Sequence, residues 1–231
     1  MSYKTEMHCH SMPVSACGRI PVEELAELYL GAGYTTVVLS NHFSRHTFNA
    51  PAAAEAVTWE KKVEFFLSDW EKMKALSMGR LHVLLGMEFR LDCHAETDFL
   101  VYGLDGRFLL ANPHILELDF KSFSALVRES GGLLIQAHPF RNNVVISDPQ
   151  LIDGAEAWNC SSRHASRNDV AELWADRFSL IKTSGSDLHR TYQQIAGGIE
   201  TDSPITTDEE LLDTLRAGTY RLIRGGDPAP N

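Results

Sequence analysis

The sequence predicts an α/β fold whose sheet is mostly parallel and closes into a distorted barrel. Two observations lead to this prediction. Segments typical of strands and helices alternate along the chain, which favours parallel strands joined by right-handed crossovers. About seven strands fall within 231 residues that contain no repeat, low-complexity tract or interdomain linker. A single domain over residues 1–231 with that many strands favours a closed barrel over an open sheet.

The first half of the chain contains four expected strands and two expected helices. The first helix, residues 21–30, has Pro21 at its first position and Glu23 and Glu24 in its first turn, and Gly31 ends it. The second, residues 54–78, is long and amphipathic. Strands are expected at residues 4–9, 35–39, 81–89 and 98–104.

The second half repeats this alternation. Helices are expected at residues 120–129, 168–177 and 207–217, the last with Thr207 and Glu210 at the spacing of a capping box. Strands are expected at residues 133–137, 154–158, 180–183 and 219–224. Residues 225–231 are expected to form a loose tail.

Composition narrows the class of protein. The formal charge of −10 argues against a broad nucleic-acid surface. No apolar run approaches the roughly 20 residues of a membrane span, and a cleaved signal peptide is not expected, because its removal would take His8 and His10 with it. The four cysteines form no CxxC pair, so we expect reduced thiols in a cytoplasmic protein.

Potential metal ligands follow most of the expected strands. Side chains two residues apart in a strand point to the same face, so His8 and His10 can bind one ion together, as can Asp187 and His189. Function in α/β barrels gathers at the carboxyl ends of the strands, where these residues fall. The full set is His8, His10, His42, Glu88, His138, Asp187 and His189.

Imidazoles and carboxylates together favour zinc, iron or manganese. Glu88 is the best candidate to bridge two ions, because a carboxylate has two oxygens. Two ions about 3.5–4 Å apart can share a hydroxide and polarise a phosphoryl or carbonyl oxygen. The pattern therefore predicts a metallohydrolase.

Five segments resemble the motifs of the polymerase and histidinol phosphatase (PHP) family, in the order in which that family has them. They are residues 7–11 (MHCHS), 39–42 (LSNH), 86–88 (GME), 137–139 (AHP) and 185–189 (GSDLH). The resemblance implies a distorted (β/α)7 barrel, two or three divalent metal ions and hydrolysis of phosphoesters. It also implies that His8, His10, Glu88 and Asp187 hold a first ion, that Glu88 and His138 hold a second, and that His42 and His189 hold a third.

The chain departs from the family at three positions. Asn41 stands where the family often has Asp. The replacement of Asp by Asn is expected to remove only a hydrogen bond to a metal ligand. The family commonly has an additional ligand of the third metal a few residues after the first motif, and Cys17 is the nearest match to it. Cys17 is either a ligand, which would favour zinc or ferrous iron, or a small packed thiol. Asp98 stands where the family often has a histidine at the second metal, as a ligand or as a strand cap.

Arginines near the same strand ends are candidates for binding substrate. Arg141, three residues after His138, is expected to bind a phosphate and to stabilise the negative charge that develops on it. Arg163 and Asn159 on one loop, and Arg190 beside His189, are further substrate-binding candidates. The region of His189 is also a candidate source of the proton for the leaving group.

Three functions remain open from the sequence. The leading one is a phosphatase acting on a small phosphorylated molecule, with histidinol phosphate, a nucleotide and phosphotyrosine all possible substrates. The second is a phosphodiesterase or nuclease, which the acidic charge disfavours. The third is a non-catalytic module stabilised by metal, although such a scaffold needs only one ion. The sequence predicts no oligomeric state.

Overall fold

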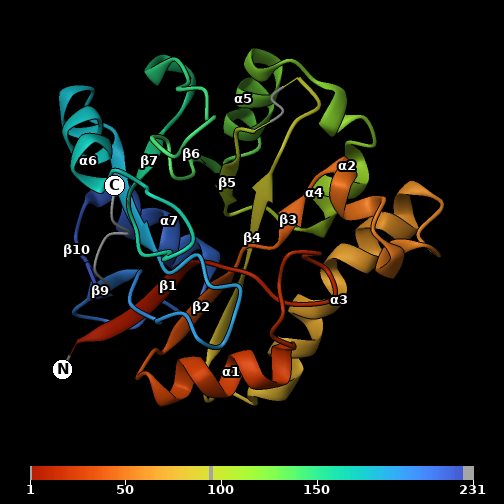
Figure 1. The fold of residues 1–231 in the computed structure, drawn as a ribbon, viewed down its shortest axis with the longest axis horizontal. Helices are drawn as coiled ribbons and strands as arrows, with labels where there is room; N and C mark the ends of the chain where they lie inside the picture. Colours follow the sequence, from red (N-terminus) through yellow and green to blue (C-terminus); the bar gives the residue numbers. More distant parts are fainter. Residues whose placement is uncertain (1, 94–95, 226–231) are drawn as a thin grey trace.

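The computed structural model describes residues 2–93 and 96–225, in which ten strands form one sheet surrounded by helices (Figure 1). The strand order is β10-β9-β1-β2-β4-β5-β6-β7-β8, and β3 pairs with β4. The strands are β1 Tyr3–Cys9, β2 Thr36–Leu39, β3 His42–Phe43, β4 His82–Phe89, β5 Phe99–Tyr102, β6 Leu133–Gln136, β7 Gly154–Asn159, β8 Ile181–Gly185, β9 Ile199–Thr201 and β10 Arg221–Leu222.

Every expected strand is present, and β3 and β9 are additional. These two strands have two and three residues, too few for alternation of polar and apolar side chains to reveal them. The sheet is more mixed than predicted, because β5 runs antiparallel to both β4 and β6. The reason is the short connection of residues 90–98, since a parallel crossover needs a dozen or more residues.

The five predicted helices are present, with two boundary changes, and the short helices α2 and α4 are additional. Pro21 caps α1 instead of opening it, and α3 begins after Thr58, whose side chain accepts a hydrogen bond from the Lys61 amide. The capping box of Thr207 and Glu210 is confirmed. The helices are α1 Val22–Gly31, α2 Arg45–Phe48, α3 Trp59–Ser77, α4 Gly106–Ala111, α5 Phe120–Glu129, α6 Asn168–Arg177 and α7 Asp208–Ala217, with 3-10 helices at Pro51–Ala53, Ile115–Glu117 and Pro149–Leu151.

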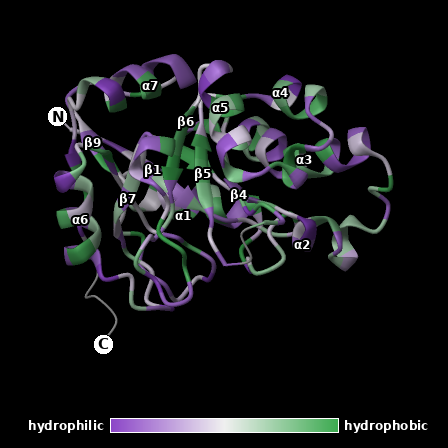
Figure 2. Cartoon of the chain, turned by 90° about the horizontal axis from the view of Figure 1, so that it is seen from above, coloured by the Kyte–Doolittle hydropathy of each residue, from purple (hydrophilic) through white to green (hydrophobic). Residues whose placement is uncertain are grey.

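Apolar residues of the sheet pack on both of its faces. Much of β5 and β6 is coloured as hydrophobic in Figure 2. On one face, Met7, Val38, Leu100 and other strand residues pack together and against α7. On the other face, strand residues pack against α1 and α3 in one cluster and against α3, α4 and α5 in another. Adjacent residues of a strand point to opposite faces of the sheet. Because both faces are buried here, the strands are nearly continuous apolar runs.

The first and last parallel strands meet and close one end of the barrel. The chain beyond β8 pairs with the end of β1: the amide of Asp187 donates to the His8 carbonyl (2.8 Å) and the amide of His10 donates to the Leu188 carbonyl (3.1 Å). Gly185 permits this approach, since a Cβ there would lie 2.3 Å from the Cβ of His8. The predicted barrel is thus nearly closed at the end that carries the candidate ligands.

None of the helices in the described ranges has the length and apolar character needed to cross a bilayer. Of the expected loose tail, Gly225 is held by a hydrogen bond from its amide to the Ala196 carbonyl. Residues 226–231 lie outside the described residues.

Candidate metal centre

Four predicted ligands from three separate strand ends converge in the interior. Nε2 of His8 and Nε2 of His10 lie 3.3 and 3.4 Å from the two carboxylate oxygens of Glu88. Oδ1 of Asp187 lies 3.7 Å from the same His8 atom and 3.4 Å from that of His10. All four residues are buried. The closure between β1 and the segment after β8 is what brings Asp187 to the two histidines.

The donor atoms in this cluster fit a divalent ion. Nε2 of His8, Nε2 of His10 and both oxygens of Glu88 are buried without a hydrogen-bond partner in the described chain. Buried polar atoms left unpaired are costly, and a cation among them would satisfy all four. The other ring nitrogens are held, His8 Nδ1 by Glu156 (2.8 Å) and His10 Nδ1 by Ser15 (3.3 Å), which leaves each Nε2 to face the ion.

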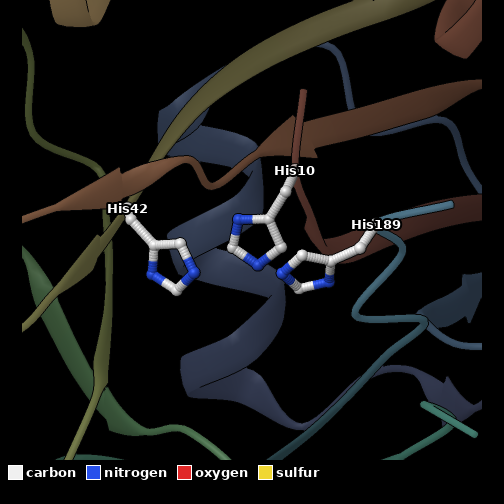
Figure 3. Close-up of side chains that lie close together, drawn as sticks. All are labelled: His10, His42 and His189. Carbon is white, nitrogen blue, oxygen red and sulfur yellow. The ribbon is translucent and has the colours of Figure 1, made fainter. Parts of the chain in front are cut away.

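Three imidazoles form a second group of donors. His10 lies between His42 and His189, with ring centroids 4.4 and 4.2 Å away (Figure 3). One ring nitrogen of each histidine lies within 4.8 Å of one ring nitrogen of the other two, close enough to share an ion. The three residues come from the ends of β1 and β8 and the start of β3.

Cys17 lies in the same cavity as His42 and His189. Burial raises the pKa of its thiol, but hydrogen bonding and the charges of His189 and His42 outweigh burial and lower the pKa to about 5. A thiolate beside two imidazoles is the donor set that zinc or ferrous iron prefers. Cys17 as a ligand stays a prediction, and its position favours that alternative over a packed thiol.

His138 and Glu88 are placed as the resemblance implies for another ion. Nε2 of His138 lies 3.4 Å from Oε1 of Glu88. His138 and Asp187 have φ angles of +28° and +47°, a region that side chains with a Cβ seldom adopt. Backbone strain of this kind concentrates at functional sites.

Asp98 reaches this end of the barrel because β5 is antiparallel, so that the start of β5 lies beside the ends of its neighbours. Both oxygens of Asp98 accept hydrogen bonds from Arg90, at 2.7 and 2.6 Å. The same carboxylate lies within 4.8 Å of ligand atoms of His42 and Glu88. Metal binding by Asp98 therefore stays a prediction, and Arg90 is a site residue that the sequence reasoning did not select.

Two polar residues of β7 support the ligands from behind. Glu156 accepts hydrogen bonds from His8 Nδ1, from the His138 amide (2.9 Å) and from the Asn159 side chain (2.9 Å). Asn159 also donates to Oδ2 of Asp187 (3.3 Å). Asn159 is buried and does not line the cavity, so the structure places this predicted substrate-binding residue behind the ligands.

Asn41 has the supporting position expected for it. Its Oδ1 accepts hydrogen bonds from the Ser11 amide (2.8 Å) and the Ser15 hydroxyl (2.7 Å). Ser15 in turn contacts Nδ1 of His10. The side-chain amide of Asn41 therefore contacts His10 indirectly, through Ser15, in the position where the family often has a carboxylate.

A cavity of about 370 Å³ opens onto the cluster. Of the predicted arginines, Arg141 and Arg163 line it and Arg190 does not. His164 also lines it, with Nε2 3.2 Å from Oδ2 of Asp187 and its ring 5.3 Å from that of His138. The sequence offered one signal for His164, its place on the loop that follows Asn159.

The charges of the cluster are strongly coupled. Burial raises the pKa of Glu88, but His42 and His8 overcome it and hold the pKa well below its usual range. Burial and the neighbouring histidines 189 and 42 lower the pKa of His10 well below its usual value. Burial lowers the pKa of His189, but Asp187 and Cys17 overcome it and raise the pKa to about 9.

Metal uptake is therefore expected to strengthen as pH rises. His189 carries a proton at neutral pH in the metal-free protein, and an ion must displace that proton to bind its ring. Apparent affinity should rise by up to about tenfold per pH unit for each proton released, up to about pH 9. Calorimetry in buffers of different ionisation enthalpy measures the released protons. Affinity that stays constant from about pH 6 to about pH 9 would contradict this linkage.

No protein-family model matches the chain, and no curated protein matches it in sequence. Solved structures do. A two-domain protein of Bacteroides vulgatus ATCC 8482, which contains a predicted PHP-like metal-dependent phosphoesterase, superimposes with a TM-score of 0.66 at 15% identity, over 97% of this chain. The chain spans 65% of that protein's length.

Two other solved structures are similar. A Bifidobacterium adolescentis protein, assigned by prediction as a metal-dependent phosphoesterase, has a TM-score of 0.54 at 17% identity, over 93% of this chain and 96% of its own. A lesion-specific endonuclease of Pyrococcus furiosus has a TM-score of 0.62 at 14% identity, over 96% of this chain and 58% of its own. These likenesses confirm the predicted fold, a barrel like that of PHP-like phosphoesterases.

Proposed function

We propose that this protein is a metal-dependent hydrolase of phosphoesters and that its substrate is a phosphomonoester. The observation that carries the proposal is the buried set of unpaired donor atoms of His8, His10 and Glu88 beside Asp187. A site built for structure alone closes its ion off with protein ligands. Here a cavity lined by further histidines and arginines opens onto the ligands, which supports catalysis.

Each side chain has a role in this proposal. His8, His10, Glu88 and Asp187 would hold one ion, and Glu88 together with His138 would hold a further ion. His42, His189 and Cys17 would hold a third. Bound zinc, iron or manganese supplies Lewis acidity and lowers the pKa of water.

Arg141 and the cavity histidines complete the machinery. Arg141 donates hydrogen bonds to the phosphoryl oxygens and stabilises the negative charge that they gain in the transition state. His164 lines the cavity and is the proposed proton donor to the leaving group, and His189 takes this role where the third ion is not bound. Asn159 and Glu156 position Asp187 and His8 for these steps.

A phosphodiesterase or nuclease is the second candidate. The likeness to the Pyrococcus furiosus endonuclease favours it, since that protein acts on nucleic acid with a barrel of the same fold. The formal charge of −10 favours a small phosphorylated substrate instead. The four cysteines are all unpaired, which fits the proposal of a cytoplasmic protein.

Metal analysis followed by a phosphoester panel tests the proposal. The expected result is two or three divalent ions per chain and faster hydrolysis of p-nitrophenyl phosphate than of bis-p-nitrophenyl phosphate. Faster hydrolysis of the diester, or cleavage of an oligonucleotide, would support the nuclease. One tightly held ion and no turnover would support a non-catalytic module.

The Arg141→Ala variant is expected to raise KM by about tenfold to a hundredfold, because a charge-assisted hydrogen bond to phosphate contributes about 1.5–3 kcal/mol. Its metal content should match that of the wild type. Steady-state kinetics and elemental analysis of the same preparation measure both. Loss of metal with an unchanged KM would make Arg141 a structural residue.

A further inference from the structure

Arg141 and Arg163 both line the cavity, and Arg163 is otherwise exposed to solvent. Half of the fourteen arginines form an ion pair with an acidic residue in the described chain, as Arg45 does with Asp92, and these two do not. In the part of the chain that the structure describes, no carboxylate lies within ion-pairing distance of the guanidinium of Arg141 or Arg163. In a protein with a formal charge of −10, two unpaired arginines at one cavity are a notable concentration of positive charge.

These two arginines come from different loops and line the same cavity as the metal-ligand candidates. Arg141 belongs to the loop after β6 and Arg163 to the loop after β7, and these strands are parallel neighbours. The acids that line the cavity, Glu88 and Asp187, already belong to the ligand set. The proposed function assigns the phosphoryl group to the ions and Arg141, so the guanidinium of Arg163 is available to bind another anionic group.

The rest of the cavity is polar. Ser44, His46 and Thr47 form part of its lining, and no aliphatic, Phe, Tyr or Trp side chain from the described residues contributes to it. Pockets for drug-like or aromatic molecules are mostly apolar, and bases are commonly bound by stacking on aromatic rings. A cavity of about 370 Å³ with this lining fits a small hydrophilic molecule.

We propose that the substrate carries a second anionic group, a carboxylate or a second phosphate, on a short hydrophilic body, and that Arg163 binds this group. The inference rests on the proposed function, in which Arg141 and the ions bind the scissile phosphoryl group. It adds the class of substrate: an anionic phosphorylated metabolite, in place of an amine, a nucleoside or an aromatic phosphoester.

Binding of non-hydrolysable phosphonates tests this inference independently of turnover. The metal-loaded protein is titrated calorimetrically with 3-phosphonopropionate and with propylphosphonate, which differ in the carboxylate. We expect the carboxylated probe to bind at least about tenfold more tightly, since hydrogen bonds to charged groups are worth more than the 1.4 kcal/mol that a tenfold change represents. Methylenebisphosphonate, which carries a second phosphonate in place of the carboxylate, is titrated in the same way. Its affinity relative to that of 3-phosphonopropionate distinguishes a site for a second phosphate from a site for a carboxylate.

Variants assign the preference to a residue. Arg163→Gln should reduce the affinity ratio of the two probes to about one, whereas Arg107→Gln, at a side chain 92% exposed on α4, should leave the ratio unchanged. The Arg163→Gln variant also controls for chelation of the ions by the carboxylate, because a preference that comes from chelation would persist in this variant.

The outcomes separate this inference from the proposed function. Equal affinity for the two phosphonates, or a preference that survives Arg163→Gln, overturns the second anion site even if phosphoesters are hydrolysed. In the hydrolytic assay, 3-phosphoglycerate or fructose 1,6-bisphosphate should exceed glycerol 3-phosphate in kcat/KM by at least about tenfold. Absence of turnover with every ester overturns the proposed function, and the binding ratio still decides the anion site.

Discussion

The Glu88→Gln variant is expected to lose most of its bound metal and to lower kcat by at least about a thousandfold, or about 4 kcal/mol in the activation free energy. Both oxygens of Glu88 face ligand atoms: Oε1 lies 3.3 Å from His8 and 3.4 Å from His138, and Oε2 lies 3.4 Å from His10 and 2.7 Å from His42. An amide removes one anionic oxygen and places an N–H beside the imidazoles. Elemental analysis and steady-state kinetics measure the two losses.

The fold should survive this change. Glu88 lies on β4, whose backbone hydrogen bonds to β3 and β5 do not involve the side chain. Circular dichroism should therefore match that of the wild type. Glu64→Gln is a matched control, because that side chain is 68% exposed on α3 and pairs with the exposed Lys61. Full metal content with undiminished turnover in Glu88→Gln would refute the bridging role.

The Glu156→Gln variant is expected to weaken metal binding by about tenfold to a hundredfold, the usual effect of removing a partner that orients a metal-ligating histidine. Oε1 of Glu156 holds Nδ1 of His8, and Oε2 holds the amide of His138, whose φ is +28°. The amide nitrogen that replaces one carboxylate oxygen cannot accept a hydrogen bond, so either Nδ1 of His8 or the amide of His138 loses its acceptor. One buried carboxylate thus positions ligands attributed to two different ions.

Two measurements separate positioning from a general loss of stability. The Kd for zinc or manganese should rise in Glu156→Gln while the Tm of the metal-free protein falls by only a few degrees, as about 1 kcal/mol does in a domain of this size. Glu129→Gln, at an exposed position that ends α5, should change neither quantity. An unchanged Kd together with a large drop in Tm would make Glu156 a residue of the core alone.

Several features of the site could be predicted because they depend on local sequence. Residues two apart in a strand share a face, so His8 and His10 were recognisable as one pair and Asp187 and His189 as another. Strand periodicity located β1, β2, β4 and β6, and hence His42, Glu88 and His138 near their ends. The capping residues Thr207 and Glu210 marked the start of α7 for the same reason.

Other features depend on how distant segments pack. The antiparallel direction of β5 brought Asp98 to the ligand end of the barrel, where both of its oxygens accept hydrogen bonds from Arg90, eight residues earlier. Glu156 could equally have been a core residue until the hydrogen bond to His8, 148 positions away, assigned its partner. His164 joined Asp187 only through the fold of the loop after β7.

The amino-acid sequence alone determined the order of the longer strands and helices, the barrel class and the identity of the principal candidate ligands, because periodicity and spacing act over a few residues. The tertiary structure decided which atoms face one another: the closure of β1 onto the segment after β8, the reversed β5, and the two unpaired arginines of the cavity. These depend on contacts between residues far apart in the chain, which the spacing of a sequence does not encode.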